Sequence, residues 1–172
     1  MDNQQFRLEI LSASDKDIFM AEAQAAFQKG FEDYYGKTDD FVLPLSDIVS
    51  SFDCKGSIAY KAILDGEMMG GAIIVIKPES AYGHLDLLYV KTETQSRGVG
   101  KRIWQEIERL HPEIKVWETC TPYFDKRNIH FYVNVCGFHI VEFFNSHHSD
   151  PEMPDNFIGD GGEGMFRFRK EL

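Results

Sequence analysis

The sequence lacks the features that mark membrane, secreted and nucleic-acid-binding proteins. No apolar run approaches the roughly 18 residues of a membrane span, and the first ten residues do not have the basic-then-apolar layout of a signal peptide. Lys and Arg total 18 against 28 Asp and Glu, a formal net charge of -10, whereas a nucleic-acid binder usually carries a basic face. The three cysteines are scattered without a CxxC pair. We therefore expect a cytoplasmic protein with neither a membrane nor a nucleic-acid partner.

What the chain does have is the composition of one globular domain. It contains 172 residues, of which 43% are hydrophobic and 13% aromatic, so it is long enough to bury a core and too apolar to be disordered. We expect a single domain over residues 1–172, because no linker, repeat or low-complexity segment divides the chain. The acidic balance suits a cationic partner, although acidity also serves solubility alone.

One stretch, from His84 to Leu110, organises the rest of the chain. It reads as an apolar strand, then a polar loop with Gly98 and Gly100, then a helix with apolar residues at helical spacing. A helix start has unpaired N–H groups and partial positive charge, and glycine lets an anion approach the backbone. The stretch therefore predicts a phosphate or pyrophosphate site. Neither the P-loop spacing nor the full Gly-x-Gly-x-x-Gly dinucleotide pattern is present.

The remaining patterns predict the element order β-α-α-β-β-β-α-β-α-β-β. A first helix ends near Gly30, and residues 31–41 read as a loop. Asp65-Gly66 predicts a hairpin turn, and Gly70-Gly71 predicts a bulge or a close backbone approach in the returning strand. Residues 165–169 read as a final edge strand. The fold class expected is α/β (α+β), with a mixed, mostly antiparallel central sheet and helices on both faces.

Two motifs resemble those of the GNAT acetyltransferases. Residues 95–100, Gln-Ser-Arg-Gly-Val-Gly, resemble the family's Gln/Arg-x-x-Gly-x-Gly/Ala loop, and Asn128 and Tyr132 followed by Gly137-Phe138 resemble its Asn-x-x-x-Tyr helix. The resemblance covers nearly the whole chain and implies acetyl-CoA as co-substrate, with no metal. The cofactor-binding residues that it implies are Leu88, Tyr89, Val90, Gln95, Ser96, Arg97, Gly98, Val99, Gly100, Lys101 and Asn128.

The same resemblance implies how the chemistry is divided. Tyr132 takes the place of the family's general acid, which donates a proton to the departing sulfur. Asp86, a carboxylate between two leucines, is the predicted general base. Glu118 is the reserve candidate, and His84 reads more readily as a hydrogen-bonded strand histidine. His147-His148 reads as a solvated pair in a polar loop, not as a metal site.

The predicted activity is transfer of an acetyl group to a primary amine of a small molecule or peptide by direct attack. The acidic segments 32–40 and 150–163 favour a cationic amine. The alternatives are a non-catalytic acyl-CoA sensor or docking module with the same fold, and a different nucleotide-binding α/β enzyme. An edge strand near the C-terminus offers a surface for a homodimer.

Overall fold

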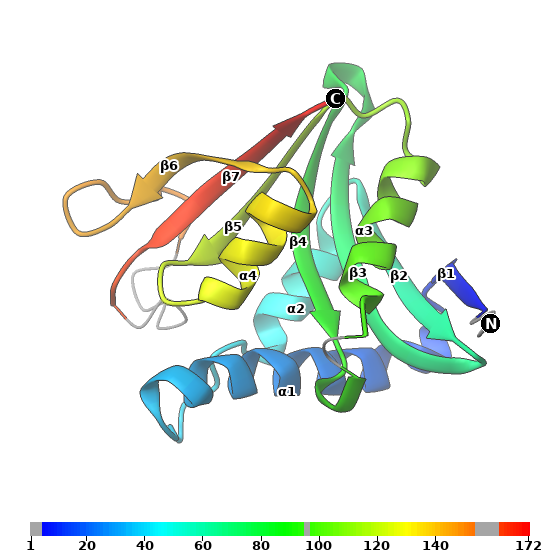
Figure 1. Cartoon of the computed structure of the whole chain (residues 1–172), viewed down its shortest axis with the longest axis horizontal. Helices are drawn as coiled ribbons and strands as arrows, with labels where there is room; N and C mark the ends of the chain where they lie inside the picture. The colour runs from blue at the N-terminus through cyan, green and yellow to red at the C-terminus, as the bar shows by residue number, and fades with distance from the viewer. Residues whose placement is uncertain (1–4, 95–96, 154–161) are drawn as a thin grey trace.

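The computed structural model describes residues 5–94, 97–153 and 162–172, and its centre is one mixed β-sheet (Figure 1). In the described residues the sheet has the order β1-β2-β3-β4-β5-β7-β6. The β4–β5 pair is parallel and the other pairs are antiparallel, which confirms the predicted fold class and element order. The strands are β1 (Phe6–Ile10), β2 (Ser57–Leu64), β3 (Glu67–Lys77), β4 (Tyr82–Val90), β5 (Val116–Pro122), β6 (His139–Phe144) and β7 (Met165–Glu171).

Helices cover both faces of the sheet. On one face α3 (Val99–Leu110) and α4 (Lys126–His130) pack over a core that includes Ile103 and Trp117; a π-helical turn, Phe131–Val135, continues α4. On the other face α1 (Lys16–Tyr35) and α2 (Leu45–Asp53) pack over a smaller core built around Phe19 and Ile73. Among the described residues, no helix combines the length and apolar character needed to cross a membrane.

The predicted turn and glycine positions are confirmed. Asp65 and Gly66 both have positive φ, 52° and 88°, as the two central residues of a tight hairpin require. A Cβ on Gly70 would lie 2.4 Å from the carbonyl oxygen of Tyr89, and one on Gly71 would lie 2.4 Å from the Phe19 ring. The two glycines therefore allow β3 to approach β4 on one side and α1 on the other.

Two sequence predictions about element boundaries are wrong. Residues 31–35 are not a loop: α1 continues to Tyr35 and stops at Gly36, where φ is 89°. The extra turn is stabilised because its aromatic side chains pack around Phe124. Strand β7 is not an edge, since it is hydrogen-bonded to β5 on one side and β6 on the other, and its Phe168 is fully buried. The sheet edge near the C-terminus is β6.

Strands β4 and β5 separate soon after they meet. Their parallel ladder contains only the pairs Tyr82↔Val116, Gly83↔Trp117 and His84↔Glu118. The Thr119 hydroxyl then donates a hydrogen bond of 2.9 Å to the Leu85 carbonyl, and beyond it the strands diverge (Figure 1). We call the opening between Asp86–Val90 and residues 119–122 the wedge, and Leu85 and Thr119 its apex. Asp86 is the extra residue of a β-bulge, because Leu85 and Leu87 pair with consecutive residues of β3.

Candidate active site

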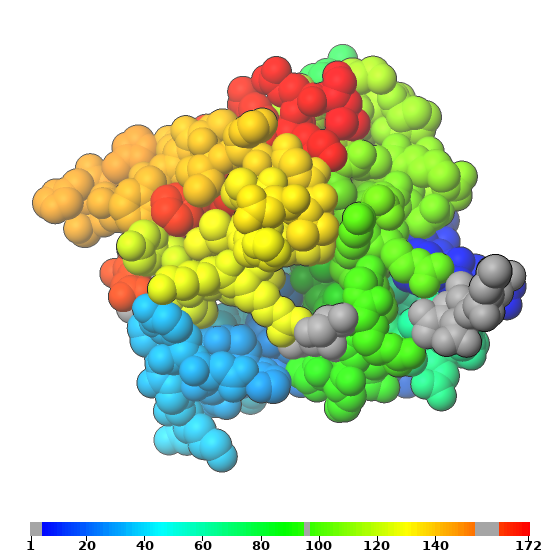
Figure 2. All heavy atoms as spheres, in the orientation of Figure 1, coloured from blue at the N-terminus to red at the C-terminus, as the bar shows by residue number. Residues whose placement is uncertain are grey.

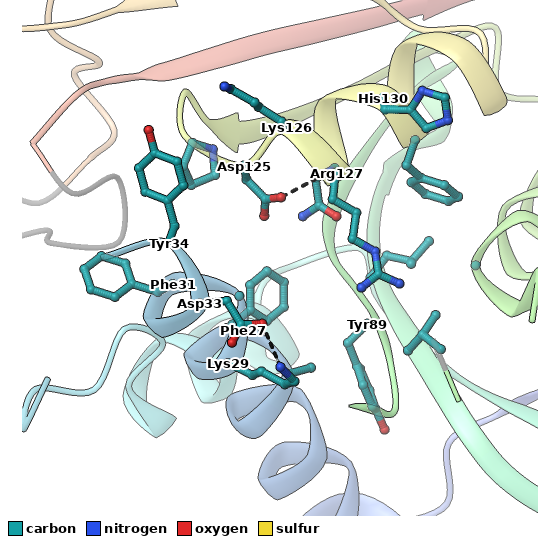
Figure 3. A pocket seen from close by; sticks show the side chains of 18 of the residues that line it. Phe27, Lys29, Phe31, Asp33, Tyr34, Tyr89, Asp125, Lys126, Arg127 and His130 are labelled. Carbon is teal, nitrogen blue, oxygen red and sulfur yellow. Dashed lines mark hydrogen bonds and ion pairs between the residues drawn. The ribbon is translucent and has the colours of Figure 1, made fainter. Parts of the chain in front are cut away.

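A cavity of about 690 Å³ lies at the open end of the wedge. Its walls come from α1, the ends of β4 and β5, the start of α3, and α4 with the segment before it. Figure 2 shows its mouth as a recess where the surfaces of α1, α4 and the β4–α3 segment meet. Figure 3 shows the interior, with α1 on one side and Asp125 and Arg127 on the other.

The start of α3 presents free backbone donors to this cavity. Gly98 caps the helix in the left-handed conformation, with φ of 75°. The first helical hydrogen bond runs from the Arg102 N–H to the Gly98 carbonyl. Among the described residues, the amides of Val99, Gly100 and Lys101 therefore have no partner, as expected for a first helical turn. These amides, with the positive end of the helix dipole, form a site suited to an anion.

The two glycines of this loop serve different purposes. A Cβ on Gly98 would meet nothing within 4 Å, so its role is conformational and the space in front of it is open. A Cβ on Gly100 would lie 3.3 Å from the Phe131 ring and 3.5 Å from Val90. Gly100 thus allows α3 to pack closely against α4 and β4, which holds the amides at the end of the wedge.

A basic and polar rim faces these amides. Lys101, Lys126 and Arg127 line the cavity, and they are the cations that a phosphate-bearing ligand would meet. Asn128 also lines it, and its side-chain amide has no hydrogen-bond partner among the described residues. Its backbone N–H is held by the Asp125 carboxylate at 3.0 Å, which caps α4. Burial raises the pKa of Asp125.

The opposite end of the cavity is aromatic. Phe31, Tyr34 and Tyr35 on α1 surround Phe124, with ring centroids 5.0 to 5.7 Å from it. The Tyr35 hydroxyl donates a 2.6 Å hydrogen bond to Glu163, which brings the start of one predicted acidic segment to the end of the other. Within the cavity wall, Lys29 is already paired with Asp33 at 2.6 Å (Figure 3).

Tyr132 lies behind the apex of the wedge and does not line the cavity. Its ring is 6% exposed and packs against Phe138 and Phe168. Its phenol lies near the side chain of Thr119, the residue that donates a hydrogen bond to the Leu85 carbonyl at the apex. Burial raises the pKa of the Tyr132 phenol, so it is protonated at neutral pH.

Asp86 and His84 lie on the sheet face of α1 and α2, away from the cavity lining. The Asp86 carboxylate is bonded to Nδ1 of His84 at 2.6 Å. Glu118, the reserve base, is fully engaged: it accepts from the Tyr82 hydroxyl at 2.8 Å and from Arg169 at 3.3 Å, and pairs with Arg167. Among the described residues, no group of three or more His, Cys, Asp or Glu side chains is placed to hold a metal ion.

The structure brings most of the predicted cofactor residues to one cavity. Those that line it are Leu88, Tyr89, Val90, Gly98, Val99, Gly100, Lys101 and Asn128. Arg97 is exposed and does not line it, and Gln95 and Ser96 fall outside the described residues. Sequence reasoning missed Phe124, Lys126 and Arg127. The basic pair immediately before Asn128 was the available signal, but nothing in the sequence placed it opposite α3.

Comparison with known proteins gives one consistent result. A family model described as Acetyltransferase (GNAT) family matches residues 17–138. The protein YrkN of Bacillus subtilis (strain 168) is 41% identical over 169 residues, which cover 95% of this chain and 91% of that protein.

Solved structures agree on the fold. The PaiA N-acetyltransferase of Thermoplasma acidophilum, in complex with coenzyme A, has a TM-score of 0.69 at 16% identity, with 98% of this chain and 99% of that one covered. The spermidine N-acetyltransferase of Vibrio cholerae, in complex with coenzyme A and spermine, has a TM-score of 0.67 at 10% identity, with 97% and 95% covered.

Proposed function

The chain belongs to the GNAT acetyltransferase family, and from that membership we propose that it transfers an acetyl group from acetyl-CoA to a primary amine by direct attack. The observation that carries the proposal is the wedge between β4 and β5, whose open end lies at the unpaired amides of α3. An extended thioester arm fits beside an unpaired strand edge, and its diphosphate fits a helix start.

In this proposal the start of α3, the end of β4 and Asn128 bind successive parts of the cofactor. The amides of Val99 to Lys101 bind the pyrophosphate of coenzyme A, with the predicted Gln95, Ser96 and Arg97 completing the loop. The backbone of Leu88 to Val90 pairs with the pantetheine arm as an added strand would. The free side-chain amide of Asn128 supplies a further hydrogen bond. No metal takes part.

The reacting groups meet near the apex. Tyr132 donates its proton to the sulfur as the thiolate leaves, since a neutral phenol behind the apex is a suitable general acid. The acceptor approaches from the sheet face of α1 and α2, where Asp86 and His84 lie next to the point of separation. The amine then attacks the thioester from the face of the wedge opposite the bound cofactor.

We propose a cationic amine as the acceptor. The Tyr35–Glu163 hydrogen bond joins the two acidic segments beside Phe124, which lines the aromatic end of the cavity. Beside it, Tyr34 is 50% and Tyr35 38% exposed, and aromatic faces attract ammonium groups. The similarity in fold to a spermidine N-acetyltransferase is compatible with this class of substrate.

The test is a thiol-release assay across cationic, neutral and acidic amines, with Tyr132→Phe as the paired variant. We expect release with cationic amines, and a fall in kcat of roughly 10²- to 10⁴-fold in Tyr132→Phe, with unchanged affinity for coenzyme A. The rival function, an acyl-CoA sensor or docking module, predicts binding without turnover by either protein. Release only with neutral or acidic amines would refute the cationic acceptor.

The proposed setting is the cytoplasm. Cys54, Cys120 and Cys136 are all free thiols, and free thiols persist most readily in a reducing compartment.

The contact that we propose for a homodimer is the β6 edge, where Ile140, Val141 and Phe143 are 39 to 47% exposed. Sedimentation velocity of the wild type and of Val141→Lys tests that contact.

A further inference from the structure

We propose that the general base is His84, with Asp86 as the positioning residue that orients its ring. The proposal deepens the proposed function and rests on it: the reaction is the same acetyl transfer, and the new content is which atom accepts the proton of the amine. It also revises the sequence-based choice of Asp86 as the base.

The position of the pair is the first observation. His84 belongs to the last β4–β5 ladder pair, His84↔Glu118, and Asp86 is the bulged residue just beyond it. Both therefore lie where the strands begin to separate. Along β4, Leu85 packs into the core under α3, whereas Leu87 packs into the core under α1 and α2. Because side chains alternate along a strand, His84 lies on the second face, from which the acceptor approaches.

The second observation is the hydrogen bond itself. Nδ1 of His84 lies 2.6 Å from Oδ1 of Asp86. A carboxylate can only accept, so the ring donates from Nδ1 and its Nε2 keeps a lone pair. Nε2 has no hydrogen-bond partner among the described residues, and the two side chains are 33% and 22% exposed. The imidazole is thus oriented by one nitrogen, while the other makes no hydrogen bond within the described residues and belongs to a partly exposed side chain.

General base efficiency favours the imidazole over the carboxylate. In model peptides imidazole ionises at about 6.5 and aspartate at about 3.9, and a base works best when it ionises near the working pH. The carboxylate gains more by orienting the ring and stabilising the imidazolium that forms, which is the division of labour known for His–Asp pairs elsewhere.

The neighbouring ionisable groups on the strands are engaged elsewhere, and on α1 the Glu22 carboxylate lies near Tyr89 and Lys91. Glu118 is held by Tyr82, Arg167 and Arg169. Lys77 on β3 lies over the Tyr82 ring at 5.6 Å.

Two more groups on this face stay neutral near pH 7. Burial raises the pKa of the Cys120 thiol to about 12. The pKa of the Tyr82 phenol is raised as well, by burial and by Glu118.

The proton balance is complete with the groups named. Nε2 of His84 takes one proton from the ammonium, and the free amine lone pair forms a C–N bond to the thioester carbonyl carbon. The C–S bond then breaks, the thiolate takes the proton of Tyr132, and the nitrogen gives up a second proton that restores the phenol. The imidazolium returns its proton to solvent. The products are the N-acetylamine, free coenzyme A and one proton.

The kinetic test compares His84→Gln, Asp86→Asn and Asp86→Ala in the acetyl-CoA assay over pH. We expect His84→Gln to lower kcat by roughly 10²- to 10⁴-fold and to abolish the acidic limb of the kcat profile, with KM for acetyl-CoA unchanged. Asp86→Asn keeps an acceptor oxygen but loses the charge that stabilises the imidazolium, so it should lower kcat by less than His84→Gln does. The control is His147→Gln, since His147 is an exposed histidine of the segment after β6 whose printed hydrogen bond is made by its backbone N–H, to Asn145. It leaves the profile unchanged.

An NMR arm needs no turnover. In the ¹⁵N spectrum of the wild type, His84 should be the Nδ1–H tautomer, and Asp86→Ala should shift it toward Nε2–H. A wild-type Nε2–H tautomer would overturn the proposal, as would full activity and an unaltered acidic limb in a folded His84→Gln. If no amine is acetylated by the wild type, the proposed function fails, while the NMR arm still decides whether the oriented pair exists.

Discussion

At the scale of single residues, Gly98 shows how one backbone conformation supports the cofactor loop. It starts α3 with φ of 75° in open space, and a side chain in that conformation costs roughly 1 to 2 kcal/mol. We expect Gly98→Ala to lower the free energy of unfolding by about that amount. It should also weaken binding of coenzyme A, because a changed backbone conformation at Gly98 moves the amides at the start of α3 that bind the pyrophosphate.

Gly30 is the matched control for stability. It lies within α1, has no positive φ, and a Cβ there would meet nothing within 4 Å. Gly30→Ala should therefore raise the free energy of unfolding by about 0.5 to 1 kcal/mol. Urea unfolding followed by circular dichroism measures both variants. Equal stability of the two alanine variants would contradict the role assigned to the Gly98 conformation.

Asp125 gives a residue-scale prediction about pH. Burial raises its pKa above the ordinary value, so the folded state binds the proton more tightly than the unfolded chain, and its contribution to stability falls as pH rises through the interval just above about 4. Asp125→Asn keeps the oxygen that caps α4 and removes the buried charge. It should be more stable than the wild type at pH 7, with the difference shrinking toward pH 4.

The alanine variant separates charge from capping. Asp125→Ala loses both the charge and the bond to the Asn128 N–H, so it should be about 1 kcal/mol less stable than Asp125→Asn. Thermal unfolding at pH 4, 5.5 and 7 resolves the two effects. If Asp125→Asn were no more stable than the wild type at pH 7, the proposal that the buried Asp125 carboxylate destabilises the fold would be refuted.

At the scale of elements, the chain is most predictable where periodicity and turn chemistry agree. The bounds of the strand Ser57–Leu64 and of the helix Val99–Leu110 follow from apolar spacing and from Asp65-Gly66 and Gly98 at their ends. The last turn of α1 could not be predicted the same way. Its aromatic residues look like a loop beside so many acids, and they are helical because Phe124, about ninety residues away in sequence, packs among them.

In the candidate site, too, features with a local sequence pattern were predictable and features set by distant contacts were not. The glycine loop and Asn128 were predictable because their spacing is local. The geometry of His84 and Asp86 was not, because it depends on a bulge in β4 and on where the β5 ladder stops, and neither leaves a local signal. The π-helical turn Phe131–Val135 is also invisible to a 3.6-residue period; it leaves Tyr132 in the core and Phe131 lining the cavity.

At the scale of the whole molecule, the wedge is a consequence of topology. The parallel β4–β5 pair is joined through α3, while β3 and β7 hold the outer sides by antiparallel pairing. Strands in a sheet twist relative to one another, so two strands anchored on opposite sides separate once their ladder ends. The helix that crosses between them begins at the open end, which places its unpaired amides beside the gap.

This arrangement predicts which nucleotides stabilise the folded chain. A ligand that binds only the folded state at a hundred times its Kd adds about 2.7 kcal/mol, and for a chain of this length each kcal/mol raises Tm by roughly 2 to 4 °C. Acetyl-CoA and coenzyme A should therefore raise Tm by roughly 5 to 11 °C. NAD and ATP carry phosphates but no pantetheine arm to pair with Leu88–Val90, so their shift should be much smaller at equal concentration. Differential scanning fluorimetry measures all four, and a larger shift with NAD than with coenzyme A would favour the rival nucleotide-binding enzyme over the acyltransferase.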